Sequence, residues 1–289
     1  MTHIFYTPTQ LYRRLHLGNA GDTDVYLRAA SGARDILDLG CGWGRTSLAL
    51  AQQGYFVSAV DLEPEFLEEL KLRAAQLNLT NNLQSFRQDI RHLLLDNPDG
   101  TRKTFDRILI PYNTLYALGG AEQVASCLRQ VRLHLKPEGE LWFDVYDMDE
   151  FHSTYDANDI DPDEDEPVAS WDTPAGLVEV LERTEVNHLS KRLLVTYTAL
   201  LSDKKHHGKS RRGQAKQLGE LKLDHHYLLT DQLETLIEGV GLQVRGRFLG
   251  SELLVPFDNH PLPATQPELS DEEENGGPIF YVASFASPH

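Results

Sequence analysis

The residues with the clearest chemical potential form a glycine-rich turn, Gly40-Cys41-Gly42-Trp43-Gly44-Arg45, directly after the short apolar run DILDL. Glycine has no Cβ, so such a turn brings the backbone close to a ligand and directs the N-terminus of the next helix toward it. A nucleoside or a carboxylate suits that site. A dinucleotide turn follows G-x-G-x-x-G, whereas here the third glycine comes one place early and Arg45 occupies the last glycine position, which disfavours NAD.

Two aspartates flank this turn. Asp61 follows Gly40 by 21 residues, at the end of the next apolar run. An acidic side chain at that point accepts hydrogen bonds from both ribose hydroxyls and repels a 2′-phosphate. Asp38 lies two residues before Gly40. Its position predicts a carboxylate at a strand end, near the ammonium group of an amino-acid-like ligand.

The elements around these residues alternate between strands and helices, which indicates a parallel sheet. Apolar runs near the C-terminal end of the chain add two further strands to five in the first half, with helical patterns between the strands. The predicted strands are 35–40, 55–61, 82–90, 105–113, 140–147, 241–250 and 278–286, and the predicted helices include 46–54, 64–79, 121–135 and 230–241.

A change of composition interrupts this alternation after the fifth strand. Residues 147–167 are acidic and contain proline, which is typical of a loop. Residues 176–186, 191–201 and 221–229 are rich in Val, Leu, Thr and Tyr and predict antiparallel strands. The predicted domain organisation is an N-terminal helical lid (1–33), a core (34–146 and 229–289) and an inserted β lobe (147–228).

The ordered set D-L-G-C-G-W-G-R, Asp61, Asp89-Ile90 and FDRILIPYNTLYAL resembles class I S-adenosylmethionine-dependent methyltransferases over roughly residues 20–146, and by element order again from about 228. The resemblance implies an α/β, Rossmann-like fold: a seven-stranded, mostly parallel sheet with helices on both faces and an antiparallel β insertion after the fifth strand. It implies that three glycines of the turn line the methionine moiety, that Asp61 binds ribose and that Asp89 with Ile90 brackets adenine. Asp89 can instead be a helix N-cap. The full expected cofactor set is Asp38, Gly40, Cys41, Gly42, Gly44, Arg45, Asp61, Leu62, Asp89, Ile90 and Pro111.

The segment PYNTLYAL and the β insertion are similar to small-molecule methyltransferases, namely amino-sugar N-methyltransferases and the glycine N-methyltransferase group. Ala117 stands where the glycine N-methyltransferase pattern often has histidine, so glycine is not assigned as substrate. We expect transfer to a nitrogen or oxygen of a small molecule, with the lid and the β lobe closing over the site. An amine needs little help from a base, whereas a hydroxyl needs a nearby proton acceptor. The candidate side chains for this role are Tyr112, Asn113, Tyr12, His152 and Tyr6.

Composition narrows the partners. The 289 residues include 27 basic and 44 acidic side chains, a net charge of −17 that disfavours nucleic acid. No apolar run is long enough to cross a bilayer, and the N-terminus lacks a secretory pattern, so we expect a cytoplasmic protein. The pairs His206-His207 and His225-His226 point to opposite faces of a strand, and no metal site is expected. The oligomeric state is not predicted.

Two other functions fit the sequence. A methyltransferase acting on protein or RNA is supported by the basic segment 204–216. A non-catalytic module that binds S-adenosylmethionine is the second alternative, because no acid-base group is identifiable from the pattern alone.

Overall fold

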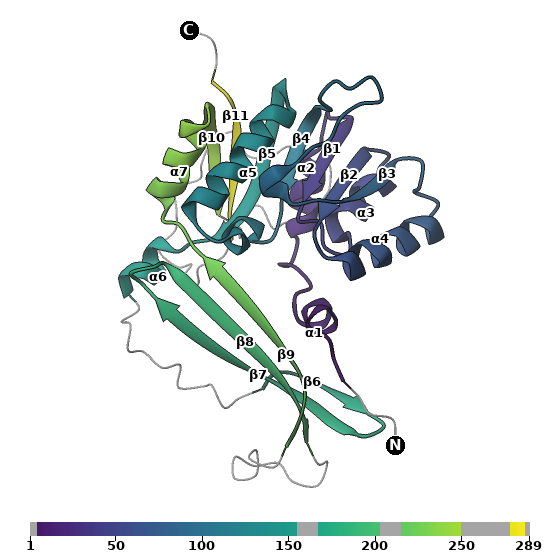
Figure 1. Cartoon of the computed structure of the whole chain (residues 1–289), viewed down its shortest axis with the longest axis vertical. Helices are drawn as coiled ribbons and strands as arrows, with labels where there is room; N and C mark the ends of the chain where they lie inside the picture. Colours follow the sequence, from purple (N-terminus) through teal and green to yellow (C-terminus); the bar gives the residue numbers. More distant parts are fainter. Residues whose placement is uncertain (1–4, 155–166, 203–214, 250–277, 287–289) are drawn as a thin grey trace. The chain divides into compact units, whose positions relative to one another are not determined.

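The computed structural model describes residues 5–154, 167–202, 215–249 and 278–286 (Figure 1). The chain forms two compact units. The larger comprises Gly18–Ser153 and Leu228–His289, and the smaller comprises Met1–Leu17 and Thr154–Tyr227. The cofactor-site residues predicted from the sequence all belong to the larger unit.

A seven-stranded sheet forms the centre of the larger unit, in the order β10-β11-β5-β4-β1-β2-β3. The five strands from β3 to β5 are parallel, while β11 runs antiparallel to both β5 and β10. This confirms the predicted mostly parallel, Rossmann-like sheet. The strands are β1 (Asp35–Leu39), β2 (Phe56–Asp61), β3 (Leu83–Arg87), β4 (Phe105–Ile110), β5 (Leu135–Tyr146), β10 (Leu242–Leu249) and β11 (Pro278–Phe285).

Helices lie in two groups on this sheet (Figure 1). One group packs around buried residues of α2, α3 and α4 in a single apolar cluster. In the other group α5 contacts α7 and two 3-10 turns, η1 and η2. Both faces of β1 are therefore covered, and its last four residues are all buried. The helices are α2 (Asp22–Ala29), α3 (Arg45–Gln52), α4 (Pro64–Gln76), η1 (Ile90–His92), η2 (Thr114–Leu118), α5 (Ala121–His134), α6 (Asp149–Thr154) and α7 (Thr230–Gly239).

The register of the parallel strands brings their carboxyl ends to one edge. Leu39 pairs with Val60, Asp38 with Leu109 and Ile110 with Phe143. The glycine turn, Asp61, the turn after β4 and the end of β5 consequently lie at the same edge of the sheet. Ligands of open parallel sheets bind beyond this edge.

The smaller unit is a four-stranded antiparallel sheet, in the order β6-β7-β8-β9, with α1 packed on it through Leu11. Its strands are amphipathic: Val178 and Val180 are buried, whereas alternate residues of β7 are partly exposed. The inserted antiparallel sheet is thereby confirmed. Its elements are α1 (Pro8–Leu15), β6 (Pro167–Thr173), β7 (Gly176–Asn187), β8 (Arg192–Ser202) and β9 (Lys216–His226).

The structure differs from the sequence interpretation at three places. Helix α6 lies within the stretch interpreted as loop, because Asp149 and Glu150 in its first turn favour a helix start. Strand β6 was not predicted at all, although it pairs with β7 through a short turn at Thr173–Gly176. The two helices in residues 1–33 belong to different units, since α1 packs on the small sheet and α2 on the large one.

Within the described residues, no helix combines the length and apolar character that a membrane span requires. The basic segment, apart from residues 215 and 216, lies outside the described residues, and so do His206 and His207.

Candidate functional site

The glycine turn has the backbone that its sequence predicts. Gly40, Gly42 and Gly44 have φ angles of 72°, 53° and 87°, in the left-handed region where a Cβ is disfavoured. A Cβ on Gly40 would lie 2.4 Å from Thr114 Cγ2, and one on Gly44 would lie 2.1 Å from Leu70 Cδ1. A Cβ on Gly42 would meet no described atom within 4 Å. Gly42 therefore faces open space, where a ligand can approach the backbone.

Asp61 faces this open position. Its Oδ2 accepts a hydrogen bond from the Gly42 amide at 2.8 Å, and its Oδ1 accepts one from the Glu63 amide at 2.8 Å. Burial raises the pKa of Asp61, although these backbone hydrogen bonds act in the opposite direction. Each oxygen keeps a further lone pair for a hydroxyl group. The carboxylate is fixed beside the glycine turn and can still accept the hydrogen bonds of a ribose.

Asp38 is the second acid of the turn. It is fully buried, and its Oδ2 accepts a hydrogen bond from the Ser47 hydroxyl. Its Oδ1 has no partner among the described residues. Burial raises the pKa of Asp38 to about 6, while Ser47 and Arg45 lower it. A buried carboxylate oxygen without a donor is costly and suits a cationic ligand group.

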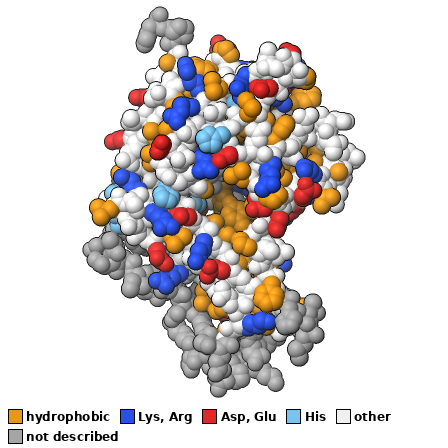
Figure 2. Space-filling view, viewed as in Figure 1, with side chains coloured by type: hydrophobic (Ala, Val, Ile, Leu, Met, Phe, Trp, Pro, Cys, Tyr) orange, Lys and Arg blue, Asp and Glu red, His pale blue; other side chains and the backbone are white. Residues whose placement is uncertain are grey.

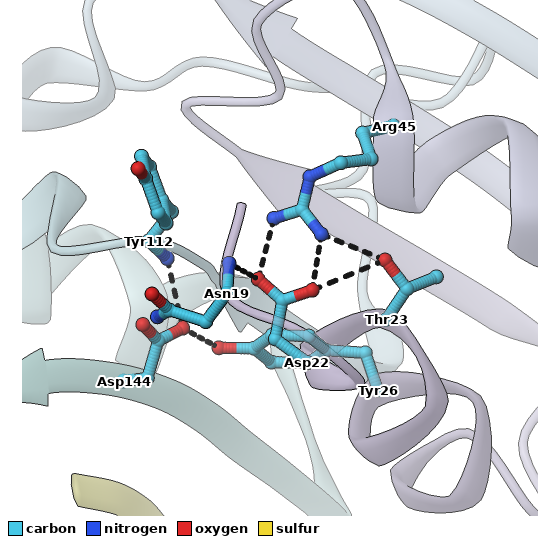
Figure 3. Close-up of polar contacts among 7 residues, drawn as sticks. All are labelled: Asn19, Asp22, Thr23, Tyr26, Arg45, Tyr112 and Asp144. Atoms are coloured by element: carbon cyan, nitrogen blue, oxygen red, sulfur yellow. Dashed lines mark hydrogen bonds and ion pairs between the residues drawn. The ribbon is translucent and has the colours of Figure 1, made fainter. Parts of the chain in front are cut away.

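Arg45 has a structural partner that the sequence did not indicate. Its guanidinium forms a bidentate pair with Asp22 at the start of α2, with Nη2 2.7 Å from Oδ2, and also donates to the Thr23 hydroxyl at 2.7 Å (Figure 3). Asp22 is almost completely buried and also accepts from the Asn19 amide. The guanidinium thus joins α2 to the glycine turn. Direct contact of Arg45 with the cofactor stays a prediction.

The predicted adenine residues lie after β3. Asp89 is the N-cap of η1, accepting from the Arg91 amide at 2.9 Å, and it pairs with the Arg91 guanidinium. The structure therefore shows the helix-cap role, and adenine binding by Asp89 stays a prediction. Ile90 is buried. Leu62, directly after Asp61, is 53% exposed, and its contact with the cofactor stays a prediction.

The turn after β4 has an unusual backbone. Tyr112 and Asn113 are consecutive non-glycine residues with φ angles of 58° and 56°. Such conformations cost on the order of 1–3 kcal/mol each and persist where the surroundings hold them. The Tyr146 amide donates to Asn113 Oδ1 at 2.6 Å, and the Thr114 hydroxyl donates to the carbonyl of the buried Pro111 at 2.6 Å. The two candidates Tyr112 and Asn113 thus lie at the same sheet edge as the glycine turn.

Asp144, near the end of β5, is a residue that the sequence analysis missed. It is fully buried, and its Oδ1 accepts hydrogen bonds from the Tyr26 hydroxyl and from the Tyr112 amide, the latter at 2.8 Å (Figure 3). Its Oδ2 has no partner among the described residues. Burial raises the pKa of Asp144 to about 6. An aspartate inside an otherwise apolar strand, LWFDVY, was the available signal.

The remaining candidates lie elsewhere. Tyr12 is on α1 in the smaller unit, where it stacks on His16 with ring centroids 4.6 Å apart. Tyr6 is in the same unit and accepts a hydrogen bond from Trp171 at 2.8 Å. His152 is on α6 in the larger unit and is partly buried. Tyr112 and Asn113 thus lie directly at the sheet edge of the glycine turn, and His152 follows the carboxyl end of β5 in the same unit.

Buried Cys41 supports the turn from inside, since its amide donates to the Val60 carbonyl at 3.0 Å. Burial raises the pKa of its thiol well above the ordinary value. On the face shown in Figure 2, basic and acidic side chains are interspersed over the described surface. Within the described residues, no group of three or more His, Cys, Asp or Glu side chains is arranged to hold a metal ion.

Comparison with known proteins agrees with this geometry. Residues 36–139 match the methyltransferase domain family. The chain is 35% identical over 118 residues to the cypemycin N-terminal methyltransferase of Streptomyces sp, covering 41% of this chain and 44% of that protein. The chain spans about half the length of the curated relatives it matches.

Solved structures resemble a larger part of the chain. The CcbJ methyltransferase from Streptomyces caelestis has a TM-score of 0.66 at 18% identity, covering 93% of this chain and 91% of that one. CalS10 with bound S-adenosylmethionine, an amino pentose methyltransferase from Micromonospora echinaspora, has a TM-score of 0.64 at 13% identity, covering 99% and 100%. At these identities the likeness concerns the fold. The family match includes the glycine turn and both strands that neighbour β1, so residues 36–139 belong to a methyltransferase domain of the class I, S-adenosylmethionine-dependent type.

Proposed function

We propose that the protein transfers the methyl group of S-adenosylmethionine to an amine nitrogen of a small molecule. The observation that carries the proposal is the open backbone at Gly42 opposite Asp61, beside a buried Asp38 oxygen that lacks a donor within the described residues. The Asp61 carboxylate matches a ribose, and the Asp38 carboxylate matches the ammonium group of the methionine part. The residues present therefore suit the cofactor.

S-adenosylmethionine, when bound, would supply a methyl group on a sulfonium, and in-line attack on that methyl carbon would release the thioether S-adenosylhomocysteine. The task of the protein is to hold the acceptor in that line, which can supply much of the acceleration. The turn after β4 is suited to this task because Asn113 is 3% exposed and bonded to β5. Tyr112 is partly exposed and can contact the acceptor.

The charge at this edge of the sheet supports an amine. Asp38 and Asp61 interact electrostatically, and so do Asp22 and Asp144, while Arg45 interacts with Asp22, Asp38 and Asp144. An excess of carboxylates at this edge attracts cations and disfavours anions. Both the sulfonium cofactor and an amine that arrives protonated fit that field, whereas an anionic acceptor does not. The amine attacks only after it has lost its proton to solvent, in its neutral form.

The relatives support the same acceptor class. The cypemycin enzyme is named as an N-terminal methyltransferase and CalS10 as an amino pentose methyltransferase, and both names describe amine substrates. We therefore include amino sugars and short peptides with a free N-terminus among the acceptors to be tested.

The experiment combines calorimetry with turnover. S-adenosylhomocysteine is expected to bind the wild-type protein, and Asp61→Ala is expected to weaken binding at least about tenfold, since charge-assisted hydrogen bonds contribute on the order of 1.5–3 kcal/mol. Glu68→Gln, at an exposed position on α4, is the matched control and should bind as the wild type does. Unchanged affinity in Asp61→Ala would overturn the cofactor assignment.

Acceptors are then compared in pairs that differ only in an amine or a hydroxyl group. Production of S-adenosylhomocysteine with the amine member of a pair supports the proposal. Turnover only with hydroxyl members contradicts the amine assignment. Tight cofactor binding with no turnover on any acceptor indicates the non-catalytic module instead.

A further inference from the structure

A closed series of contacts connects the cofactor turn with the turn after β4, and Asp144 lies within it (Figure 3). Arg45, the first residue of α3, pairs with Asp22 at the start of α2. One turn further along α2, the Tyr26 hydroxyl donates to Asp144. Asp144 in turn accepts the Tyr112 amide, and the Arg45 guanidinium lies 5.8 Å from the centroid of the Tyr112 ring.

The turn after β4 needs such support. Tyr112 and Asn113 both adopt a left-handed backbone, and neither is glycine. Two contacts to the same residue of β5 hold them: the Tyr112 amide donates to the Asp144 carboxylate, and the Asn113 amide donates to the Asp144 main-chain carbonyl at 3.3 Å. Without the carboxylate, the first of these two residues would lose the acceptor that fixes its amide direction.

Burial of the Asp144 carboxylate costs desolvation free energy, and packing alone does not explain why a charged side chain occupies this position. It is fully buried, and one of its oxygens has no partner among the described residues. An asparagine or a small apolar residue would avoid a buried charge at this position. The presence of a carboxylate at this buried position therefore indicates a role for its charge.

We propose that Asp144 is a positioning residue for the acceptor: its ionised carboxylate ties the turn at Tyr112 and Asn113 to α2, and so presents the Tyr112 side chain in one arrangement. This inference rests on the proposed methyl transfer, which it deepens. Asp144 acts through the turn and not on the reacting atoms. Cofactor binding by Gly42 and Asp61 does not depend on it.

The charged groups around Asp144 determine how it titrates. From α2, the Tyr26 hydroxyl favours the ionised form and Asp22 disfavours it, and from the start of α3, Arg45 favours it. The Tyr112 amide at the end of β4 also favours ionisation. Burial outweighs these interactions and raises the pKa of Asp144 to about 6. The burial of Tyr26 raises the pKa of its hydroxyl, which remains a neutral donor. The link is then weakened at acidic pH.

The test uses two conservative variants and two measurements. Asp144→Asn keeps the shape and an acceptor oxygen but removes the charge, and Tyr26→Phe removes one hydroxyl donor. The first measurement is the ¹H–¹⁵N resonance of the Tyr112 amide between pH 4.5 and 8, which needs no methyl transfer. It should titrate with a midpoint of about 6 in the wild type. The midpoint should rise in Tyr26→Phe and be absent in Asp144→Asn.

The second measurement is kcat/KM for an amine acceptor against pH. Asp144→Asn should lower it about tenfold at pH 8 and remove the acidic limb of the profile, with the affinity for S-adenosylhomocysteine within threefold of wild type. Tyr26→Phe should move that limb to higher pH. A purely structural role would instead lower cofactor affinity and turnover together, without moving the limb.

The failures of the two proposals are distinguishable. A Tyr112 amide that does not titrate in the wild type, or that titrates unchanged in Asp144→Asn, overturns the role of Asp144 whatever the enzyme methylates. A Tyr112 titration that behaves as expected in a protein that methylates no amine would instead overturn the proposed acceptor class.

Discussion

The turn after β1 and the turn after β4 both have a left-handed backbone, but different residue types adopt it in each. At the end of β1 the chain turns through Gly40, Gly42 and Gly44, residues for which a left-handed backbone is nearly free of strain. At the end of β4 it turns through Tyr112 and Asn113, which need hydrogen bonds from β5 to hold the same kind of backbone. The turn after β1 has no side chains at its glycines, so a ligand can approach its backbone. The turn after β4 has side chains that can contact a ligand.

Each end also has a buried aspartate, and the two are alike in burial and in raised pKa. They differ in the groups that donate hydrogen bonds to the partnered oxygen. Asp38 accepts one hydroxyl, from Ser47 on the neighbouring helix, whereas Asp144 accepts from both Tyr26 and the backbone of the strained turn. We infer that Asp38 binds a cationic group of the cofactor, while Asp144 holds the turn at Tyr112 and Asn113 in place.

Substitution by alanine should destabilise the protein much more at Gly44 than at Gly42 of the same turn. Gly44→Ala should destabilise the protein by about 3 kcal/mol, because its Cβ would overlap buried Leu70 and its backbone is left-handed. Gly42→Ala, with no atom near its Cβ, should cost only about 1 kcal/mol but weaken S-adenosylhomocysteine binding more than tenfold. Urea denaturation and calorimetry measure both. Equal stability losses in the two variants would contradict this difference.

The pH dependence of stability should distinguish the two aspartates. Because folding raises their pKa values from 3.8 to about 6, each contributes stability that is fully present below pH 4 and is lost as the pH rises through 6. Each of the variants Asp38→Asn and Asp144→Asn should remove on the order of 3 kcal/mol of this pH-dependent loss of stability. Denaturation of the ligand-free protein between pH 4 and 8 measures it.

Bound ligand should affect the two aspartates differently. S-adenosylhomocysteine retains the ammonium group, so it should stabilise the wild type and Asp144→Asn more strongly at pH 8 than at pH 5. That difference should shrink in Asp38→Asn. If Asp144→Asn, and not Asp38→Asn, abolished the difference, the roles assigned to the two carboxylates would be reversed.

A smaller effect concerns the link between the two ends. Asp22→Asn should destabilise the protein by about 1.5 kcal/mol, since Arg45 would lose its bidentate ion pair while remaining partly exposed. Thermal denaturation measures this change. Asp24→Asn, on the same helix turn, is the control and should leave the unfolding temperature unchanged. A similar loss in both variants would show that the charge of α2, and not the pairing with Arg45, is responsible.

The smallest effect is expected at the exposed Leu62. Leu62→Ser should change the free energy of unfolding by less than about 0.5 kcal/mol, because the side chain is 53% exposed. Affinity for S-adenosylhomocysteine should fall a few-fold, which calorimetry detects. No change in affinity would remove Leu62 from the predicted cofactor set.

Features that depend on local sequence could be predicted, whereas long-range contacts could not. The glycine turn was identifiable because its left-handed backbone favours glycine. Asp61 was identifiable because the apolar runs that alternate with helices place it at the end of a parallel strand. The role of Asp144 was not, since a lone aspartate in LWFDVY does not reveal that Tyr26, more than a hundred residues away, donates to it. The pairing of Arg45 with Asp22 is likewise a long-range contact. Strand β6 was missed because its sequence, PVASWDT, shows no clear alternation of polar and apolar residues. Its extended conformation depends on pairing with β7.

If this edge of the sheet serves methyl transfer to nitrogen, a transferred methyl group must be found on the nitrogen of an amine acceptor. The protein is incubated with S-adenosylmethionine that carries a trideuterated methyl group and with an amino sugar, and tandem mass spectrometry locates the label. We predict the label on the amine nitrogen, at a rate that falls at least tenfold in Asp61→Ala and is unchanged in Glu68→Gln. Label on oxygen alone, or equal transfer by Asp61→Ala, would contradict the account.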